Sequence, residues 1–147
     1  MESFDRLKGR VVGLDTSPFI YYIERRDPLL GVVRPLFEAI HAGELTAVTS
    51  IVSLIELLVV PLRSGRDDLV ARYRRLLLRA KHLRTLALDE AIAARAAELR
   101  ARYNVGVPDA VQIAAALHAG AAAFVTNDDA LRRVTDIEVL LLRDLVP

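Results

Sequence analysis

Residues 11–24, VVGLDTSPFIYYIE, join a short apolar run to a helix through a single aspartate. The run at residues 11–14 favours a strand buried on both faces of a parallel sheet. Ser17 followed by Pro18 is a start signal for a helix, because a capping residue precedes a proline at the first helical position. Asp15 therefore stands at the carboxyl end of a predicted strand, where the chain turns into a helix.

The same alternation of strand and helix continues along the chain. Further strands are predicted at residues 45–49, 83–88, 122–125 and 139–142, each a short apolar run. Helices are predicted at residues 17–24, 28–42, 51–60, 67–80, 89–103 and 108–119, with Pro61 ending the third of them. This order predicts an α/β fold, a three-layer α/β/α sandwich with a central, mainly parallel sheet. Because the chain has 147 residues and no repeat or linker, we expect one domain over residues 1–147.

Composition narrows the classes of function. The chain has no cysteine, which excludes disulfides, thiolate metal sites and cysteine nucleophiles and fits the cytoplasm. Residues 110–125 form the longest mildly apolar stretch, which is too short and too weakly apolar to span a bilayer, and no signal-peptide core is present. We therefore expect a cytoplasmic protein without membrane contact. The net charge is +1, so bulk charge does not indicate a nucleic-acid binder.

Four carboxylates stand where apolar segments give way to helix starts. They are Asp15, Glu56, Asp109 and Asp128. Parallel α/β sheets bind ligands beyond the carboxyl ends of their strands. We therefore expect at least three of these acids at one edge of the sheet. Carboxylate oxygens gathered there, without histidine or cysteine, suit Mg²⁺ or Mn²⁺.

Each of these acids also has a structural interpretation. Asp15, Asp109 and Asp128 stand near predicted helix N-termini, where an acid interacts favourably with the helix dipole. For Asp15 this interpretation is weakened by Ser17, which already offers a cap. Capping would explain each acid separately, but it leaves their position at one edge of the predicted sheet unexplained.

Glu56 has three interpretations. Together with Ser53 it matches a capping box, S-x-x-E, which would require a helix that begins only after Ser53. An earlier start at Thr49 or Ser50 would place Glu56 inside the helix. A polar stripe of Thr49, Ser53 and Glu56 would then face either bulk water or a buried cation, because an unpaired ionised glutamate is costly to bury.

Clustered carboxylates and a divalent metal support hydrolysis of a phosphodiester. A bound metal lowers the pKa of a water and neutralises charge on a phosphoryl oxygen. Competing chemistries lack their motifs, since the chain has no H-E-x-x-H, G-x-x-x-x-G-K-[ST], G-x-G-x-x-G or G-x-S-x-G. A basic run over residues 72–84 contains Arg72, Arg75 and Arg79, which would bind the phosphates of a polyanion and guide it toward the acids; a solvated outer helix face is the alternative.

Four segments together resemble the PIN-domain ribonucleases, and among them the VapC-type toxins of toxin–antitoxin pairs. The segments are GLDTSPFIYYIE, TSIVSLIELL, VPDAVQIAAAL and FVTNDDALRRV, and the likeness runs from about Val11 to Leu142. The resemblance implies an α/β/α sandwich and Mg²⁺- or Mn²⁺-dependent cleavage of RNA. It also implies a homodimer and a cognate antitoxin that covers the active-site groove.

Residue by residue, the resemblance implies a catalytic metal site with Thr16 and Thr126 orienting the pocket, Thr126 being the better candidate. The matching acids are Asp15, Glu56, Asp109 and Asp128. Two departures are evident. Many relatives carry a basic residue shortly before the third motif, where this chain has Asn104-Val-Gly-Val. The fourth motif offers both Asp128 and Asp129 as the fourth acid.

The sequence thus predicts a metal-dependent endoribonuclease in which a metal-activated water is the nucleophile. Two other functions stay open. One is a non-catalytic PIN-like module that binds RNA or a protein without cutting, which a test of Mn²⁺ binding would separate from the nuclease. The other is a metal-dependent phosphatase, which a comparison of RNA, DNA and a chromogenic phosphate ester as substrates would separate.

Overall fold

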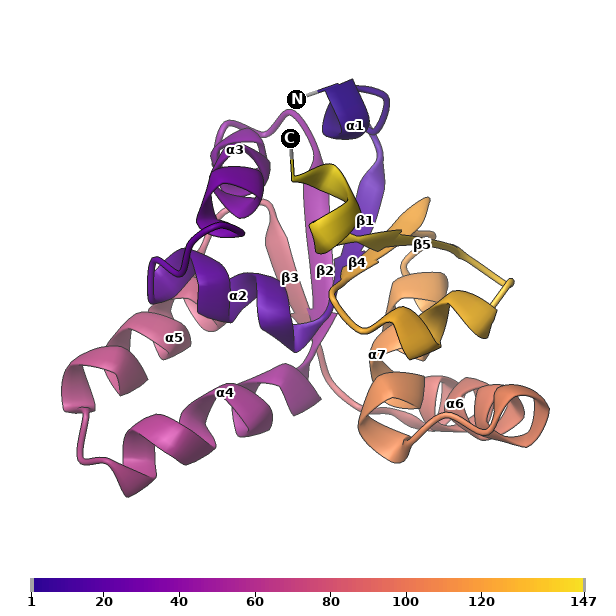
Figure 1. Cartoon of the computed structure of the whole chain (residues 1–147). Helices are drawn as coiled ribbons and strands as arrows, with labels where there is room; N and C mark the ends of the chain where they lie inside the picture. The colour runs from indigo at the N-terminus through magenta and orange to yellow at the C-terminus, as the bar shows by residue number, and fades with distance from the viewer. Residues whose placement is uncertain (1, 147) are drawn as a thin grey trace.

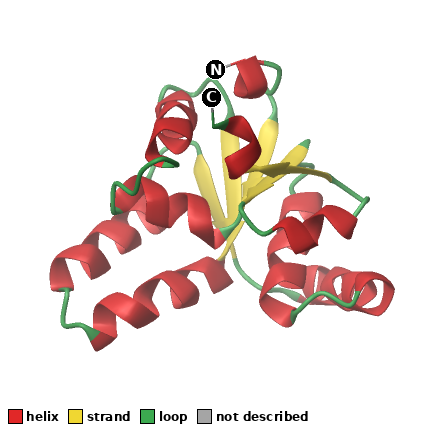
Figure 2. Ribbon diagram, viewed as in Figure 1, coloured by secondary structure: helices red, strands yellow, loops and turns green. Residues whose placement is uncertain are grey.

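The computed structural model describes residues 2–146, which contain five strands in one sheet. The strands are β1 (Val11–Leu14), β2 (Thr46–Ser50), β3 (Leu83–Leu86), β4 (Ala123–Thr126) and β5 (Glu138–Leu141). They lie in the order β3-β2-β1-β4-β5, and all four pairings are parallel. The carboxyl ends of the strands therefore meet at one edge of the sheet (Figures 1 and 2).

Helices cover both faces of this sheet (Figure 1), so the predicted three-layer α/β/α fold is confirmed. One face carries α2 (Thr16–Ile23), α3 (Leu30–His41) and α5 (Asp67–Arg79). The other carries α7 (Val107–His118), against which α6 (Glu90–Tyr103) packs. The remaining elements are α1 (Glu2–Asp5), α4 (Ile51–Arg63) and the 3-10 helices η1 (Asp129–Arg133) and η2 (Leu142–Leu145).

Successive residues of the central strands alternate between the two cores. Val12 and Leu14 of β1 pack with the α2, α3 and α5 side, whereas Gly13 faces α7. A Cβ at Gly13 would lie 2.5 Å from the Cβ of Ala116, so glycine is what allows α7 to lie this close to the sheet. The apolar stretch 110–125 divides between α7 and β4. Within residues 2–146, no helix combines the length and the apolar character that crossing a membrane requires.

The third predicted helix ends later than its proline suggests. α4 begins at Ile51 as predicted but continues through Pro61 to Arg63, so the predicted end before Pro61 is wrong. Pro61 lies in the last turn, where it removes one backbone hydrogen bond and only two residues of the helix follow it. Its ring is buried, which offsets that loss. The additional residues lengthen α4, which packs beside α5.

The strand order places a topological switch point at β1. The chain leaves β1 for β2 and β3 on one side and later returns to β4 and β5 on the other. In such sheets a crevice forms where the connections diverge, beyond the carboxyl ends of the strands. The fold therefore points to the ends of β1 and β4 as the place for a site.

Candidate active site

All four predicted acids lie beyond the carboxyl ends of the strands. Asp15 directly follows β1, and Asp128 follows β4 by two residues. Glu56 lies in the second turn of α4, which begins at the end of β2, and Asp109 lies in the first turn of α7. The starts of α2 and α4 meet at the strand tips (Figure 1). The charges of the other three acids all raise the pKa of Asp109, so folding brings the four together.

Asp15 is the buried member of the cluster, with 8% of its surface exposed. Its Oδ1 accepts a hydrogen bond from the backbone N–H of Thr16 at 2.8 Å, and its Oδ2 accepts one from the Thr126 hydroxyl at 2.6 Å. Burial raises the pKa of Asp15, the charges of Glu56 and Asp128 add to that rise, and the bonds from Thr126 and Thr16 oppose it. Thr126 thus contacts Asp15 directly through its hydroxyl.

The capping prediction for Ser17 is wrong. α2 begins at Thr16, so Asp15 and not Ser17 occupies the N-cap position. The Oγ of Ser17 is buried and has no hydrogen-bond partner among the described residues. Capping and membership of the acidic cluster are therefore two properties of the same Asp15 side chain rather than alternatives.

Glu56 lies inside α4 and not in a capping box. Ser50 caps this helix by accepting a hydrogen bond from the N–H of Val52 at 3.0 Å, which confirms the earlier of the two possible starts. The Glu56 side chain is exposed. Its Oε1 nevertheless accepts hydrogen bonds from the Thr16 hydroxyl at 2.8 Å and from Nε2 of Gln112 at 3.2 Å. Thr16 therefore contacts Asp15 through its backbone and Glu56 through its side chain.

Asp109 has a strongly raised pKa. It is half-buried in the first turn of α7. Burial raises its pKa from 3.8 to about 6, with further contributions from the charges of Asp15, Asp128 and Glu56. The guanidinium of Arg133 partly opposes this rise. Strongly perturbed carboxylates in a crevice are typical of functional sites.

The fourth motif has two acids, and they face different surroundings. The charge of Asp128 acts on Asp15 and Asp109, and its Oδ1 caps η1 by accepting from the N–H of Ala130 at 3.0 Å. Asp129 instead pairs with Arg143 at 2.6 Å, which lowers its pKa. Asp128 is therefore the acid of this pair that belongs to the cluster.

The donor set fits a hard divalent cation by its chemistry. All four side chains offer oxygen. Burial is the main cause of the raised pKa values of Asp15 and Asp109, and the charges of neighbouring acids in the cluster raise both further. As the side chains stand, no group of three or more His, Asp or Glu within residues 2–146 is arranged to hold a metal ion. Asp15 and Glu56 are instead bonded to Thr16, Thr126 and Gln112.

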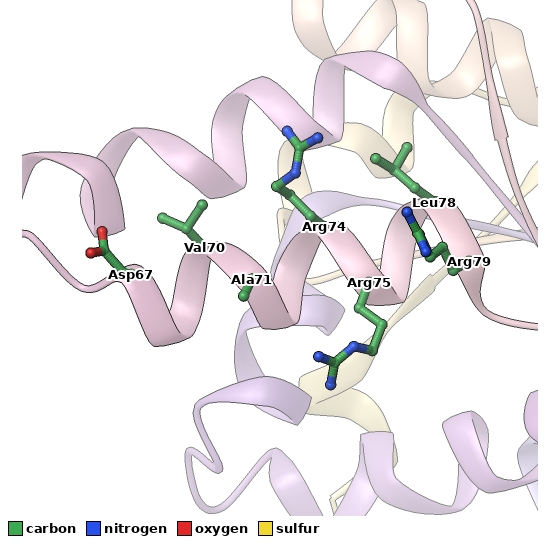
Figure 3. A pocket seen from close by; sticks show the side chains of 7 residues that line it. All are labelled: Asp67, Val70, Ala71, Arg74, Arg75, Leu78 and Arg79. Atoms are coloured by element: carbon green, nitrogen blue, oxygen red, sulfur yellow. The ribbon is translucent and has the colours of Figure 1, made fainter.

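The arginines predicted to bind RNA lie away from the acids. Arg72, Arg75 and Arg79 are exposed on α5 and line a hollow of about 360 Å³ together with residues of α2 and α3. Arg75 and Arg79 also line a second hollow, of about 530 Å³, with Arg74. Figure 3 shows Arg74 and Arg75 pointing to opposite sides of α5. None of the four acids lines either hollow.

A third hollow, of about 450 Å³, does adjoin the acidic cluster. It lies between α2, α4 and α5, and Glu56 is part of its wall. Its cations are Arg26, which pairs with Glu24 at 2.8 Å, and Arg66, which pairs with Asp68 at 2.9 Å. This hollow extends the site along α4.

Two residues of the site escaped the sequence analysis. Gln112 contacts Thr16 and Glu56, and its only signal was that it interrupts an alanine-rich helix. Arg133 acts on Asp109 and donates to the carbonyl of Asn104 at 3.0 Å. It thereby supplies a cation beside Asn104. Nothing in the sequence pattern indicated that contact.

Comparison with known proteins finds a match to the family described as the PIN domain, over residues 12–137, and none among curated proteins. VapBC2 from Rickettsia felis, bound to a DNA fragment from its promoter, has a chain with TM-score 0.70 and 18% identity, covering 89% of this chain and 98% of that one. A chain of VapBC-1 from nontypeable Haemophilus influenzae has a TM-score of 0.66 and 20% identity, and the match covers 90% of this chain and 98% of that one. VapBC-5 from Mycobacterium tuberculosis is a member of the VapBC family of toxin–antitoxin systems. Its matching chain has a TM-score of 0.56 and 22% identity, and the match covers 88% of this chain and 98% of that one. At these identities the likeness shows a shared fold.

Proposed function

The chain belongs to the PIN-domain family, and from that premise we propose that it is a Mg²⁺- or Mn²⁺-dependent endoribonuclease and the toxin of a toxin–antitoxin pair. The observation that carries the proposal is the crowding of four acids at the carboxyl edge of the sheet, where the pKa of Asp109 reaches about 6. The shared fold with chains of VapBC complexes supports the second half of the proposal.

The proposed reaction needs a metal and a water. Asp15, Glu56, Asp109 and Asp128 would hold the ion, directly or through water. When bound, the ion would lower the pKa of a water and offset charge on the phosphoryl oxygen. The side chains of the protein contribute orientation and charge, and none of them forms a covalent intermediate.

Two threonines prepare the carboxylates for this role. Hydrogen bonds from Thr126 and from the backbone of Thr16 lower the pKa of Asp15 against the effect of burial, so they favour its ionised form at neutral pH. The Thr16 hydroxyl also fixes one oxygen of Glu56. Both threonines are positioning residues in this scheme.

The RNA would meet arginines at two distances from the acids. Arg133, whose charge acts on Asp109, is the proposed contact for a phosphate next to the scissile bond. Arg72, Arg75 and Arg79 line a hollow away from the acids and are proposed to bind phosphates farther along the strand. The hollow beside Glu56 is the proposed path between these two regions.

Two protein partners belong to the proposal. One is a cognate antitoxin that covers the acidic groove; the Mycobacterium tuberculosis neighbour is described as part of a toxin–antitoxin system. The other is a second copy of this chain. Ile55, Val60 and Leu62 of α4 are 63%, 65% and 61% exposed, which is unusual for large apolar side chains and supports an interface on this helix.

The decisive experiment compares purified protein on total RNA with Mg²⁺, Mn²⁺ or EDTA, followed by mapping of the cut ends. Asp15→Asn should abolish cleavage and leave the fold intact, because it removes a ligand charge and almost no volume. Asp129→Asn is the matched control, since Asp129 pairs with Arg143 outside the cluster, and it should cleave like the wild type.

Three outcomes would contradict this assignment. Cleavage by Asp15→Asn at the wild-type rate would remove Asp15 from the reaction. A wild-type protein that binds no Mn²⁺ at millimolar concentration would indicate a non-catalytic module. Hydrolysis of a chromogenic phosphate ester or DNA in preference to single-stranded RNA would indicate a phosphatase or a deoxyribonuclease.

A further inference from the structure

Gln112 is a buried polar residue in an otherwise apolar stretch of α7. Its neighbours from Ala110 to Ala116 are alanine, valine and isoleucine, and Gln112 itself is 1% exposed. A buried amide is costly unless its donors and acceptor are hydrogen-bonded. A hydrophobic residue would pack equally well at this position, so packing alone does not explain why a polar amide is buried here.

The amide of Gln112 makes polar contacts with four side chains, and these contacts join four elements. Its Oε1 accepts from the hydroxyl of Ser53 at 3.0 Å and lies 3.2 Å from Oγ1 of Thr49, whose single proton is shared between this oxygen and the carbonyl of Leu14. Its Nε2 donates to Oγ1 of Thr16 at 3.0 Å and to Oε1 of Glu56 at 3.2 Å. One end of the side chain therefore lies in the core, and the other end contacts the acidic site.

The core end alone does not account for the amide. Thr49 donates to the carbonyl of Leu14 at 2.9 Å, and its oxygen lies 2.8 Å from that of Ser53, so both hydroxyls have partners besides Gln112. The contacts that require the amide nitrogen are those from Nε2 to Thr16 and Glu56. The opposite amide orientation would set its oxygen against a carboxylate oxygen, which is repulsive.

The hydrogen bond from Gln112 restricts the orientation of the Glu56 carboxylate. Glu56 is exposed, and among residues 2–146 no ion pair fixes its side chain. Its Oε1 accepts both available hydrogen bonds, from Thr16 and Gln112, while Oε2 has no partner among the described residues. Two donors on one oxygen hold the carboxylate in a single orientation and leave the other oxygen free.

We propose that Gln112 is a positioning residue that holds the Glu56 carboxylate, together with Thr16, so that its free oxygen is presented to a divalent cation. This inference rests on the proposed nuclease function. Gln112 acts through Glu56 and does not itself touch metal or RNA.

The test uses Gln112→Met, which keeps the length of the side chain and removes the amide. Ser53→Ala is the matched control, because it removes a hydrogen bond from the core end of the same amide and leaves the Glu56 end in place. Mn²⁺ affinity is measured by calorimetry on the full chain without RNA. Gln112→Met should weaken Mn²⁺ binding about tenfold, as loss of an outer-shell partner does, whereas Ser53→Ala should change it less than about twofold.

Two further measurements exclude a merely structural effect. Selective ¹³C labelling of glutamate should show one rotamer of Glu56 in the metal-free wild type and rotamer averaging in Gln112→Met. In a Glu56→Ala background, Gln112→Met should weaken Mn²⁺ binding no further, because the carboxylate that it holds is gone. Retention of a single Glu56 rotamer, equal losses in Gln112→Met and Ser53→Ala, or an additive double variant would each overturn the positioning role. Wild-type protein that binds no Mn²⁺ would instead overturn the nuclease proposal itself.

Discussion

Replacing Asp109 with asparagine should make the metal-free protein more stable at neutral pH. The pKa of this half-buried carboxyl rises from 3.8 to about 6, because of burial first and then because of repulsion from Asp15, Asp128 and Glu56. The ionised form is therefore disfavoured in the folded state. Asparagine is nearly isosteric with aspartate and uncharged, so Asp109→Asn removes the unfavourable charge and little volume.

The size and the sign of the effect follow from that pKa. At about 1.4 kcal/mol per pKa unit, a rise to about 6 corresponds to at most about 3 kcal/mol, and solvent screening of a half-buried group reduces the expected gain to about 1 kcal/mol. Below pH 3.8 the carboxyl is protonated in both states and costs nothing. Between pH 3.8 and 6 the unfolded chain loses the proton first, so the cost grows as pH rises and is complete above pH 6.

Urea unfolding in EDTA, followed by far-UV circular dichroism, would test this expectation at about pH 7.5 and about pH 4. Asp109→Asn should gain about 1 kcal/mol at the higher pH, or about 2–4 °C in Tm for a chain of this size, and most of the gain should vanish at the lower pH. Asp129→Asn is the control of opposite sign, since Arg143 lowers the pKa of Asp129, and it should show no gain. The reasoning is wrong if Asp109→Asn is no more stable than the wild type at the higher pH, or if its gain is undiminished at the lower one.

Three further predictions concern other parts of the molecule. Gly13→Ala should cost about 1–3 kcal/mol of unfolding free energy, because the new Cβ would lie 2.5 Å from that of Ala116. Gly31→Ala meets nothing within 4 Å and should gain about 0.5 kcal/mol in the same denaturation assay; equal effects would contradict the packing argument. Arg133→Ala should raise KM for RNA several-fold in steady-state cleavage and Arg133→Lys should recover part of it, whereas an unchanged KM would remove Arg133 from substrate binding. Ile55→Asp should convert a dimer into a monomer in light scattering, and a monomeric wild type would contradict an interface on α4.

The order and type of the elements followed from local pattern. Residues 11–14 were predicted as a strand and form β1 with the same bounds. The other predicted strands overlap β2 to β5, because each is a short apolar run between helical periodicities. The errors fell at element ends and at the short helices α1, η1 and η2, for which no range was predicted. α4 passes through Pro61, since burial of the proline ring decides there and that burial depends on the rest of the fold.

The acidic cluster was predictable because the rule behind it is topological. Ligands bind beyond the carboxyl ends of parallel strands, so acids at strand ends could be assigned to one edge without coordinates. Local hydrogen bonds were harder to predict from the sequence. Ser17 was predicted to cap α2, but Asp15 occupies the N-cap position. Asp128 and Asp129 could not be separated by sequence, because only the contact with Arg143 distinguishes them.

The sequence by itself determined the α/β/α layers, the parallel sheet and the four acids at its edge, since these depend on periodicity and on where strands end. Only the tertiary structure decided which side chains hold those acids. Gln112 reaches Thr16 and Glu56 from 96 and 56 residues away, and Arg133 reaches Asn104 from 29 residues away. Such contacts depend on how helices pack across the sheet, and no local pattern along the chain encodes that packing.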